Sequence, residues 1–206
     1  MTVGQYIDAT YNVPGVNEST IKQLDALGVL TNDVTHVLEL GPGSGRYLEP
    51  VMAICQPEHY EVYETAASWA KWLVQTYGVT LRPTDGRSLA STPTGSIDLA
   101  HAHKVMAVLP FLAICRYLLE LMRVTREGGF VVFDVPTEAC MPVETVQAWM
   151  DSDVGDGPYP SFIARKLVLD IFAARGFELV GTFLVPMMPG ETEYFVFRRT
   201  RNASAS

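Results

Sequence analysis

Short apolar runs alternate with longer segments in which apolar residues recur every three or four positions, from about residue 34 to residue 199. The short runs have the pattern of β-strands and the longer segments have the pattern of amphipathic helices. This alternation predicts a parallel sheet with helices on both of its faces. The expected strands are residues 34–40, 59–64, 79–83, 96–103 and 130–135, and the expected helices are 45–55, 67–77, 111–124 and 164–176.

The chain ends in two further apolar segments, 177–186 and 192–199, separated by the turn-type sequence MMPGE. Because a helical crossover does not fit between them, we expect an antiparallel hairpin. The stretch 136–161 is rich in Pro, Gly and Asp and is expected to be a cap inserted over the substrate site. Residues 1–33 are expected to form an N-terminal helical segment. With no repeat and no linker, residues 1–206 are predicted to be a single α/β domain with a seven-stranded sheet.

Composition narrows the class of protein. Hydrophobic residues make up 48% of the chain and charged residues 18%, as in folded globular proteins. The formal net charge of −8 disfavours nucleic acid and anionic membranes as partners. The N-terminus lacks the pattern of a secretory signal, and the longest apolar stretch, 105–115, is too short to span a bilayer. We therefore expect a cytoplasmic protein that acts on a small molecule, and a homodimer is possible.

The first candidate for chemistry is the sequence VLELGPGSGRYL at 37–48, where Gly41, Gly43 and Gly45 lie between an expected strand and an expected helix. A glycine turn in this place is typical of nucleotide binding in open α/β sheets. The dinucleotide fingerprint requires its third glycine at position 46, which is Arg46. The Lys-Ser/Thr pair of a phosphate-binding P-loop is also missing. The loop therefore departs from both phosphate-binding patterns, and with Pro42 inside the turn it is less suited to wrapping a pyrophosphate.

This stretch resembles the first motif of the class I S-adenosylmethionine-dependent methyltransferases, in particular small bacterial ones, and the resemblance runs from about residue 34 to 199. The closing pair of strands is similar to the antiparallel pair that ends the sheet in that family. The resemblance implies a Rossmann-like methyltransferase fold and S-adenosyl-L-methionine as the cofactor. An NAD-type dehydrogenase is the alternative, and Arg46 argues against it.

The resemblance also implies which residues bind the cofactor. Glu64 ends the second expected strand, where a carboxylate can accept hydrogen bonds from the ribose hydroxyls. Asp85 follows the third strand, where the family places an acceptor for the adenine amino group. The complete set of expected cofactor contacts is Glu39, Gly41, Gly43, Gly45, Glu64, Thr65, Asp85, Gly86, His101 and Tyr11.

Catalysis is expected at the end of the fourth strand, in the sequence HAHK. A hydroxyl acceptor must lose a proton as it attacks the methyl group, so its methylation needs a base. Histidine titrates near neutrality and fits this role. His103 takes the position that faces the substrate in the family, and His101 lies on the same side of the strand. We expect His103 to be the base and His101 to be the alternative.

The acceptor is expected to be a small polar compound, a sugar or a biosynthetic metabolite, that is methylated on oxygen. Trp149 and Tyr159, together with the carboxylates of the cap, suit a polyhydroxylated compound and also a cationic amine. Asp134, at the tip of the fifth strand, is a third candidate substrate contact. No three-ligand metal set is recognisable, so no metal is predicted. N-methylation of a small amine and a non-catalytic, cofactor-binding regulatory role remain alternatives.

Overall fold

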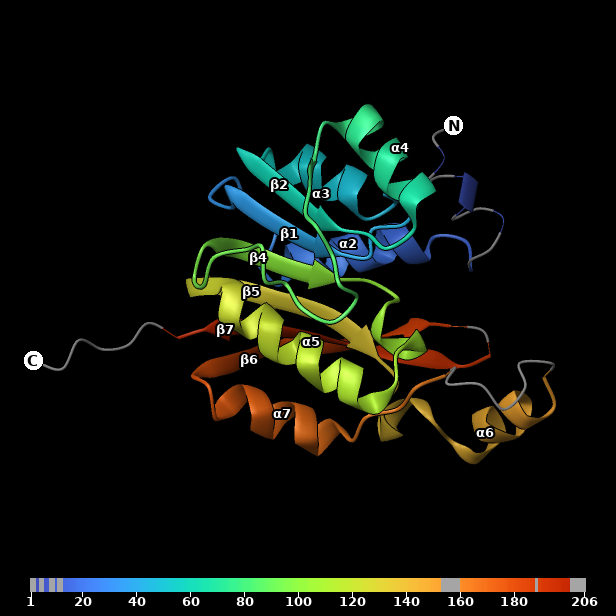
Figure 1. Cartoon of the computed structure of the whole chain (residues 1–206). Coiled ribbons are helices and arrows are strands. Elements are labelled where there is room, and N and C mark those ends of the chain that lie inside the picture. The colour runs from blue at the N-terminus through green and yellow to red at the C-terminus, as the bar shows by residue number, and fades with distance from the viewer. Residues whose placement is uncertain are drawn as a thin grey trace, which may run out of the picture.

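The computed structural model describes residues 3, 6–7, 10, 13–152, 160–187 and 189–200, and it contains one seven-stranded sheet (Figure 1). The strand order is β3-β2-β1-β4-β5-β7-β6. The strands are β1 (His36–Leu40), β2 (His59–Tyr63), β3 (Thr80–Leu81), β4 (Ile97–Ala102), β5 (Thr125–Val135), β6 (Phe177–Pro186) and β7 (Glu191–Arg199). The first five are parallel, and β7 pairs antiparallel with both β5 and β6. The predicted fold class is confirmed.

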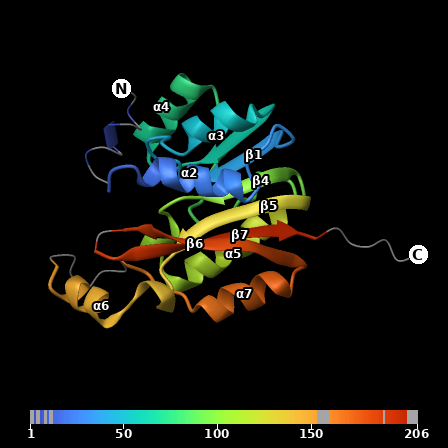
Figure 2. The same ribbon diagram turned by 180° about the vertical axis from the view of Figure 1, so that it is seen from behind.

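Helices cover both faces of the sheet, as Figures 1 and 2 show from opposite sides. The helices are α2 (Val16–Ala26), α3 (Leu48–Cys55), α4 (Ala67–Tyr77), α5 (Phe111–Val124) and α7 (Arg165–Ala173). The first three pack over one face and bury a core that includes Leu24, Leu48 and Leu73. Helices α5 and α7 pack over the other face, where Leu118 and Phe172 are fully buried. Burial of these apolar faces is the main force that holds the layers together.

Strand β5 begins earlier than expected, at Thr125 rather than at residue 130. The Gly-Gly pair at 128–129 looks like a helix stop in the sequence but lies inside the strand. A Cβ atom on Gly129 would lie 2.8 Å from the carbonyl oxygen of Asp98. The glycine therefore permits a close approach of β5 to β4, at the point where the register between the two strands shifts.

The expected cap contains the short helices η2 (Glu138–Cys140) and α6 (Val143–Met150). No residue of α6 is buried, and Figure 1 shows this helix on the side toward which the parallel strands point. The amides of Ser161 and Ile163 donate to the carbonyl oxygens of Ala107 and Pro136, which fixes the returning end of the segment. Its role as a cover of the substrate site stays a prediction. Among the described residues, no helix combines the length and the apolar character needed to cross a membrane.

Candidate functional site

A cavity of about 390 Å³ lies beside the glycine loop, at the carboxyl end of the sheet. Strand β1 is flanked by β2 on one side and by β4 on the other, so the order of the strands reverses at this point. Ligands bind at such switch points in open α/β sheets. Four of the expected site residues line the cavity: Glu39, Gly41, Gly43 and His103.

The three glycines of the loop have positive φ angles of 65°, 52° and 75°, but they meet different surroundings. A Cβ atom on Gly41 would lie 2.8 Å from Val105 Cγ2, and one on Gly45 would lie 2.9 Å from Tyr77 Cε2. A Cβ atom on Gly43 would meet no atom within 4 Å. Gly41 and Gly45 are therefore required by packing within the protein, whereas Gly43 leaves space for a ligand to approach the backbone.

Glu64 links the end of β2 to the glycine loop. Its Oε2 accepts a hydrogen bond from the Gly43 amide (2.9 Å), and its Oε1 accepts one from the Ala66 amide (2.8 Å). Each carboxylate oxygen can accept a second hydrogen bond, so both can also receive a ribose hydroxyl. Thr65 follows directly and is exposed. The placement of Glu64 agrees with its expected role, which stays a prediction.

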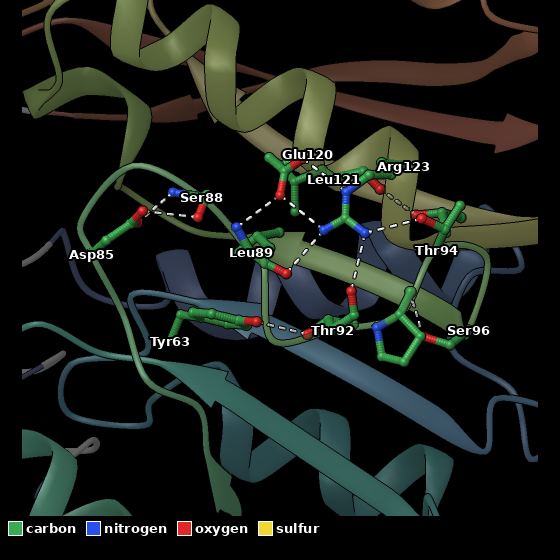
Figure 3. Close-up of polar contacts among 12 residues, drawn as sticks. Tyr63, Asp85, Ser88, Leu89, Thr92, Thr94, Ser96, Glu120, Leu121 and Arg123 are labelled. Carbon is green, nitrogen blue, oxygen red and sulfur yellow. Dashed lines mark hydrogen bonds and ion pairs between the residues drawn. The ribbon is translucent and has the colours of Figure 1, made fainter.

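Asp85 is exposed and organises its own loop (Figure 3). Its Oδ1 accepts from the amides of Arg87 (2.8 Å) and Ser88 (2.7 Å), and its Oδ2 accepts from the Ser88 hydroxyl (3.0 Å). These hydrogen bonds lower the pKa of Asp85. Gly86, in the same turn, has a φ of 69°. The two residues lie outside the cavity lining, and their contact with adenine stays a prediction.

The loop that carries Asp85 is fastened to α5 by Arg123, as Figure 3 shows. The Arg123 guanidinium donates to the carbonyl oxygens of Thr92 (3.0 Å) and Leu89 (2.9 Å) and pairs with Glu120 (2.8 Å). Glu120 in turn accepts from the Leu89 amide (2.8 Å). These charge-assisted hydrogen bonds engage both carbonyl and amide groups of the loop backbone, so they hold the loop against α5.

His103 follows β4 and lines the cavity, whereas His101, which lies on β4 and contacts His103, does not line it. His101 Nδ1 is 2.9 Å from His103 Nε2, and His103 Nδ1 is 3.0 Å from the Tyr194 hydroxyl. The His103 ring stacks on Tyr47, with centroids 3.9 Å apart. Both nitrogens of His103 therefore already have partners within the protein. His103 is therefore one member of a larger network of hydrogen-bonded side chains and not an isolated base.

The hydrogen-bonded network continues from His101 to Glu39. His101 Nε2 is 2.9 Å from the Tyr60 hydroxyl, which donates to Glu39 Oε2 at 2.6 Å. The contacts follow from strand register, because Glu39 is paired with His101 across β1 and β4 and Tyr60 is paired with Val37. All of these side chains point to the face covered by α2, α3 and α4.

Burial changes the acidity of the linked groups. It lowers the pKa of His101 to about 3 and raises the pKa of Glu39 to about 8. The pKa of His103 also lies well below its usual value, because of burial and then of the nearby charges of His101, Arg46 and Lys104. The near-neutral pKa that made histidine attractive as a base therefore does not hold in this environment.

Glu39, His101 and His103 also have the composition of a metal site, with ligand atoms within 4.8 Å of one another. The Tyr60 hydroxyl, however, lies between His101 Nε2 and Glu39 Oε2, which are 4.0 Å apart. The hydrogen-bond distances of 2.6–2.9 Å mean that these groups contact one another directly. We interpret the three residues as members of a hydrogen-bonded chain.

The two expected substrate residues that the structure describes, Asp134 and Trp149, do not line the cavity. Asp134 is fully buried and pairs with Lys104, whose ammonium lies 3.2 Å from Asp134 Oδ2 and whose amide donates to Oδ1 at 2.6 Å. Asp134 therefore does not line the cavity itself. It positions Lys104, which does. Trp149 is on α6, outside the cavity lining. Tyr11 and Tyr159 lie outside the described residues.

Sequence reasoning did not assign several residues of the cavity wall to the site, among them Arg46, Tyr47, Trp69 and Lys104. Arg46 enters the sequence argument only as a missing glycine, and Trp69 lies within the expected helix 67–77. The signals were weak, because any residue near a strand tip can face either solvent or ligand. The alternation along β2 could have placed Tyr60 on the same face as Glu39, but the contact itself depends on register.

Residues 16–182 match the family described as "Methyltransferase domain". Similar solved structures include N-methyltransferase NodS from Bradyrhizobium japonicum with S-adenosylhomocysteine (15% identity, 90% of this chain and 88% of that one, TM-score 0.66). Others are magnesium protoporphyrin IX methyltransferase from Synechocystis with the same ligand (14%, 89% and 82%, 0.65) and an O-methyltransferase family protein from Burkholderia thailandensis (11%, 90% and 59%, 0.66). No curated protein sequence matches the chain significantly.

Proposed function

Since the chain belongs to the methyltransferase domain family and is an S-adenosylmethionine-dependent enzyme, we propose that it methylates an oxygen atom of a small hydroxyl compound. A sugar or another polar biosynthetic metabolite is the proposed acceptor. The cofactor supplies an activated methyl group, so the protein must bind it, align the acceptor and take up the acceptor's proton.

The residues around the cavity fit the cofactor. The open space at Gly43 lets a ligand lie against the backbone, and Glu64 presents acceptors for ribose hydroxyls beside that loop. We assign the cofactor to Glu39, Gly41, Gly43, Gly45, Glu64, Thr65, Asp85 and Gly86. Arg46 and Lys104 add positive charge to the wall, which suits the carboxylate of the methionine moiety.

One observation favours oxygen as the acceptor atom: the cavity wall contains His103, which is connected through buried hydrogen bonds to Glu39. An amine can attack as the free base without giving up a proton beforehand, whereas a hydroxyl needs a proton acceptor. The two cations, Arg46 and Lys104, also disfavour an ammonium group in the same space. N-methylation is the second candidate, since one of the similar solved structures is an N-methyltransferase.

The proposal is tested by incubating the protein with S-adenosylmethionine labelled in its methyl group and a panel of sugars, phenols and amines. Mass spectrometry identifies the product and the methylated atom. We expect O-methylated products and an equal amount of S-adenosylhomocysteine. Gly43→Val serves as the control, because its side chain fills the space beside the loop. Products methylated only on nitrogen would overturn the assignment of oxygen.

A further inference from the structure

Five side chains form a continuous buried chain from β2 to β7: Glu39, Tyr60, His101, His103 and Tyr194. Successive polar atoms are 2.6, 2.9, 2.9 and 3.0 Å apart. Every member is at most 6% exposed. Burying so many polar groups is unfavourable unless each has a partner, and here each member has its partner in the next member of the chain.

The hydrogen bonds have a single direction. When Glu39 is ionised, Tyr60 donates its one hydroxyl proton to the carboxylate, so the Tyr60 oxygen accepts from His101 Nε2–H. His101 then carries no proton on Nδ1 and accepts from His103 Nε2–H. The remaining lone pair of His103 is on Nδ1, 3.0 Å from the Tyr194 hydroxyl, which in this arrangement donates to it rather than to the more distant Tyr47 hydroxyl at 3.5 Å. Every proton in the chain is therefore directed toward Glu39.

We propose that Glu39 is the final acceptor of the proton that the substrate hydroxyl loses, and that His103, His101 and Tyr60 relay it from the cavity wall. This inference rests on the proposed O-methylation. The acceptor hydroxyl replaces that of Tyr194 and gives its proton to His103 Nδ1. His103 Nε2–H passes its proton to His101 Nδ1, His101 Nε2–H passes its proton to the Tyr60 oxygen, and the Tyr60 proton moves to Glu39 Oε2.

The atoms and charges balance in this step. The acceptor oxygen forms a bond to the methyl carbon, the carbon–sulfur bond breaks, and its electron pair stays on sulfur. The positive charge of the sulfonium disappears as one proton arrives at the Glu39 carboxylate. The two histidines are neutral before and after the step, and each has exchanged one nitrogen-bound proton for another.

The electrostatics of the chain suit these roles. The raised pKa of Glu39 makes its carboxylate a stronger base than one in water, whereas the lowered pKa values of both histidines prevent them from retaining the proton. The pKa of Tyr60 is raised well above its usual value, so its hydroxyl keeps a proton to donate. The other charged or titratable groups facing the chain are Arg46, Cys55, Glu64, Lys104, Asp134 and Tyr47.

The test is Tyr60→Phe, which removes the hydroxyl that connects His101 to Glu39 and keeps the ring. Tyr63→Phe is the matched control, since it removes a buried hydroxyl bonded to Thr92 (2.9 Å) from the same strand. With a hydroxyl acceptor in single-turnover experiments, we expect Tyr60→Phe to lower the rate by roughly 10²-fold, within the usual range for general bases. The parent rate should rise with pH through a midpoint near 8, and only Tyr60→Phe should lose this dependence.

A second measurement needs no turnover. At pH 9, where Glu39 is ionised, the ¹⁵N NMR shifts of the histidine rings should show both His101 and His103 as the neutral Nε2–H tautomer. Protonation of Nδ1 in either residue at pH 9 would overturn the direction of the relay. Normal rate and pH dependence in Tyr60→Phe with a hydroxyl acceptor would overturn the relay alone, whereas turnover of amines only would overturn the proposed O-methylation, and with it the relay.

Discussion

Replacing Gly43 by alanine should separate ligand binding from protein stability. Gly43 has a φ of 52°, and an added Cβ would point into open space beside the cavity. A left-handed conformation costs an L-residue roughly 1–2 kcal/mol. For a chain of this size each kcal/mol lowers Tm by about 2–4 °C. We therefore expect Gly43→Ala to remain folded, with a Tm that is lower by about 2–8 °C.

Its effect on the cofactor should be larger than its effect on the fold. If the methionine moiety lies against the loop, the new methyl group occupies part of its space, and such overpacking costs about 1–3 kcal/mol. This corresponds to a loss in affinity of roughly 5- to 150-fold. Isothermal calorimetry with S-adenosylmethionine measures this loss directly, and differential scanning calorimetry measures the stability of the same sample.

Gly78 serves as the control for backbone strain, and Gly45 serves as a comparison for overpacking within the protein. Gly78 ends α4 with a φ of 67° and also has no atom within 4 Å of an added Cβ, so Gly78→Ala should show the same strain and normal affinity. Gly45→Ala would place its Cβ 2.9 Å from Tyr77 Cε2 and 3.3 Å from Leu73 Cδ2, and should be the least stable of the three. Equal cofactor affinity in Gly43→Ala and Gly78→Ala would refute the assignment of Gly43 to the cofactor.

Two further predictions concern Asp85 and the response to pH. Asp85→Asn should keep its Oδ1 contacts with two backbone amides but lose an acceptor at Oδ2. The loss in binding free energy should therefore be about 1 kcal/mol larger for S-adenosylmethionine than for an analogue that lacks the adenine amino group. Equal losses by calorimetry would assign Asp85 to its own turn. The folded state should be most stable near pH 6.5. Below that pH His101 and His103 bind protons in the unfolded state but stay neutral in the folded state, because their folded-state pKa values are lowered. Each histidine therefore lowers the free energy of unfolding by up to about 1.4 kcal/mol per pH unit. Between pH 4.5 and about 8, Glu39 binds its proton more tightly in the folded state than in the unfolded state, so the free energy of unfolding falls as the pH rises through this range. Glu39→Gln removes this proton and should therefore flatten the decline in the free energy of unfolding above pH 6.5. An unchanged decline in urea titrations of Glu39→Gln at pH 6.5 and 8 would contradict this origin.

Local patterns in the sequence determined most of the secondary structure. The apolar periodicity placed α4 at 67–77 and α5 at 111–124, and both helices have these bounds in the structure. The same is true of β6 at 177–186. These elements could be predicted because the period of burial is set by neighbouring residues on one helix face or one side of a strand. The start of β5 could not, because the Gly-Gly pair is explained only by the proximity of β4.

The glycine loop was also evident in the sequence, together with the nucleotide-type site that it predicts. The different roles of its glycines were not, since they depend on Val105 from the segment after β4 and on Tyr77 from α4. A glycine in a sequence indicates a requirement for space or for a positive φ angle. The surrounding tertiary structure decides whether that space belongs to the protein or to a ligand.

The hydrogen-bonded side chains from Glu39 to Tyr194 show most clearly which features the sequence determines and which the tertiary structure determines. The sequence placed His101 and His103 on one side of a strand and suggested proton chemistry. It could not connect them to Glu39 through Tyr60, because Tyr60 is 21 positions from Glu39 and 41 from His101. Strand register brings these residues together, and register is set by how whole strands bury their apolar faces. Burial within the folded sheet then shifts the acidity of each group, which no local pattern in the sequence contains.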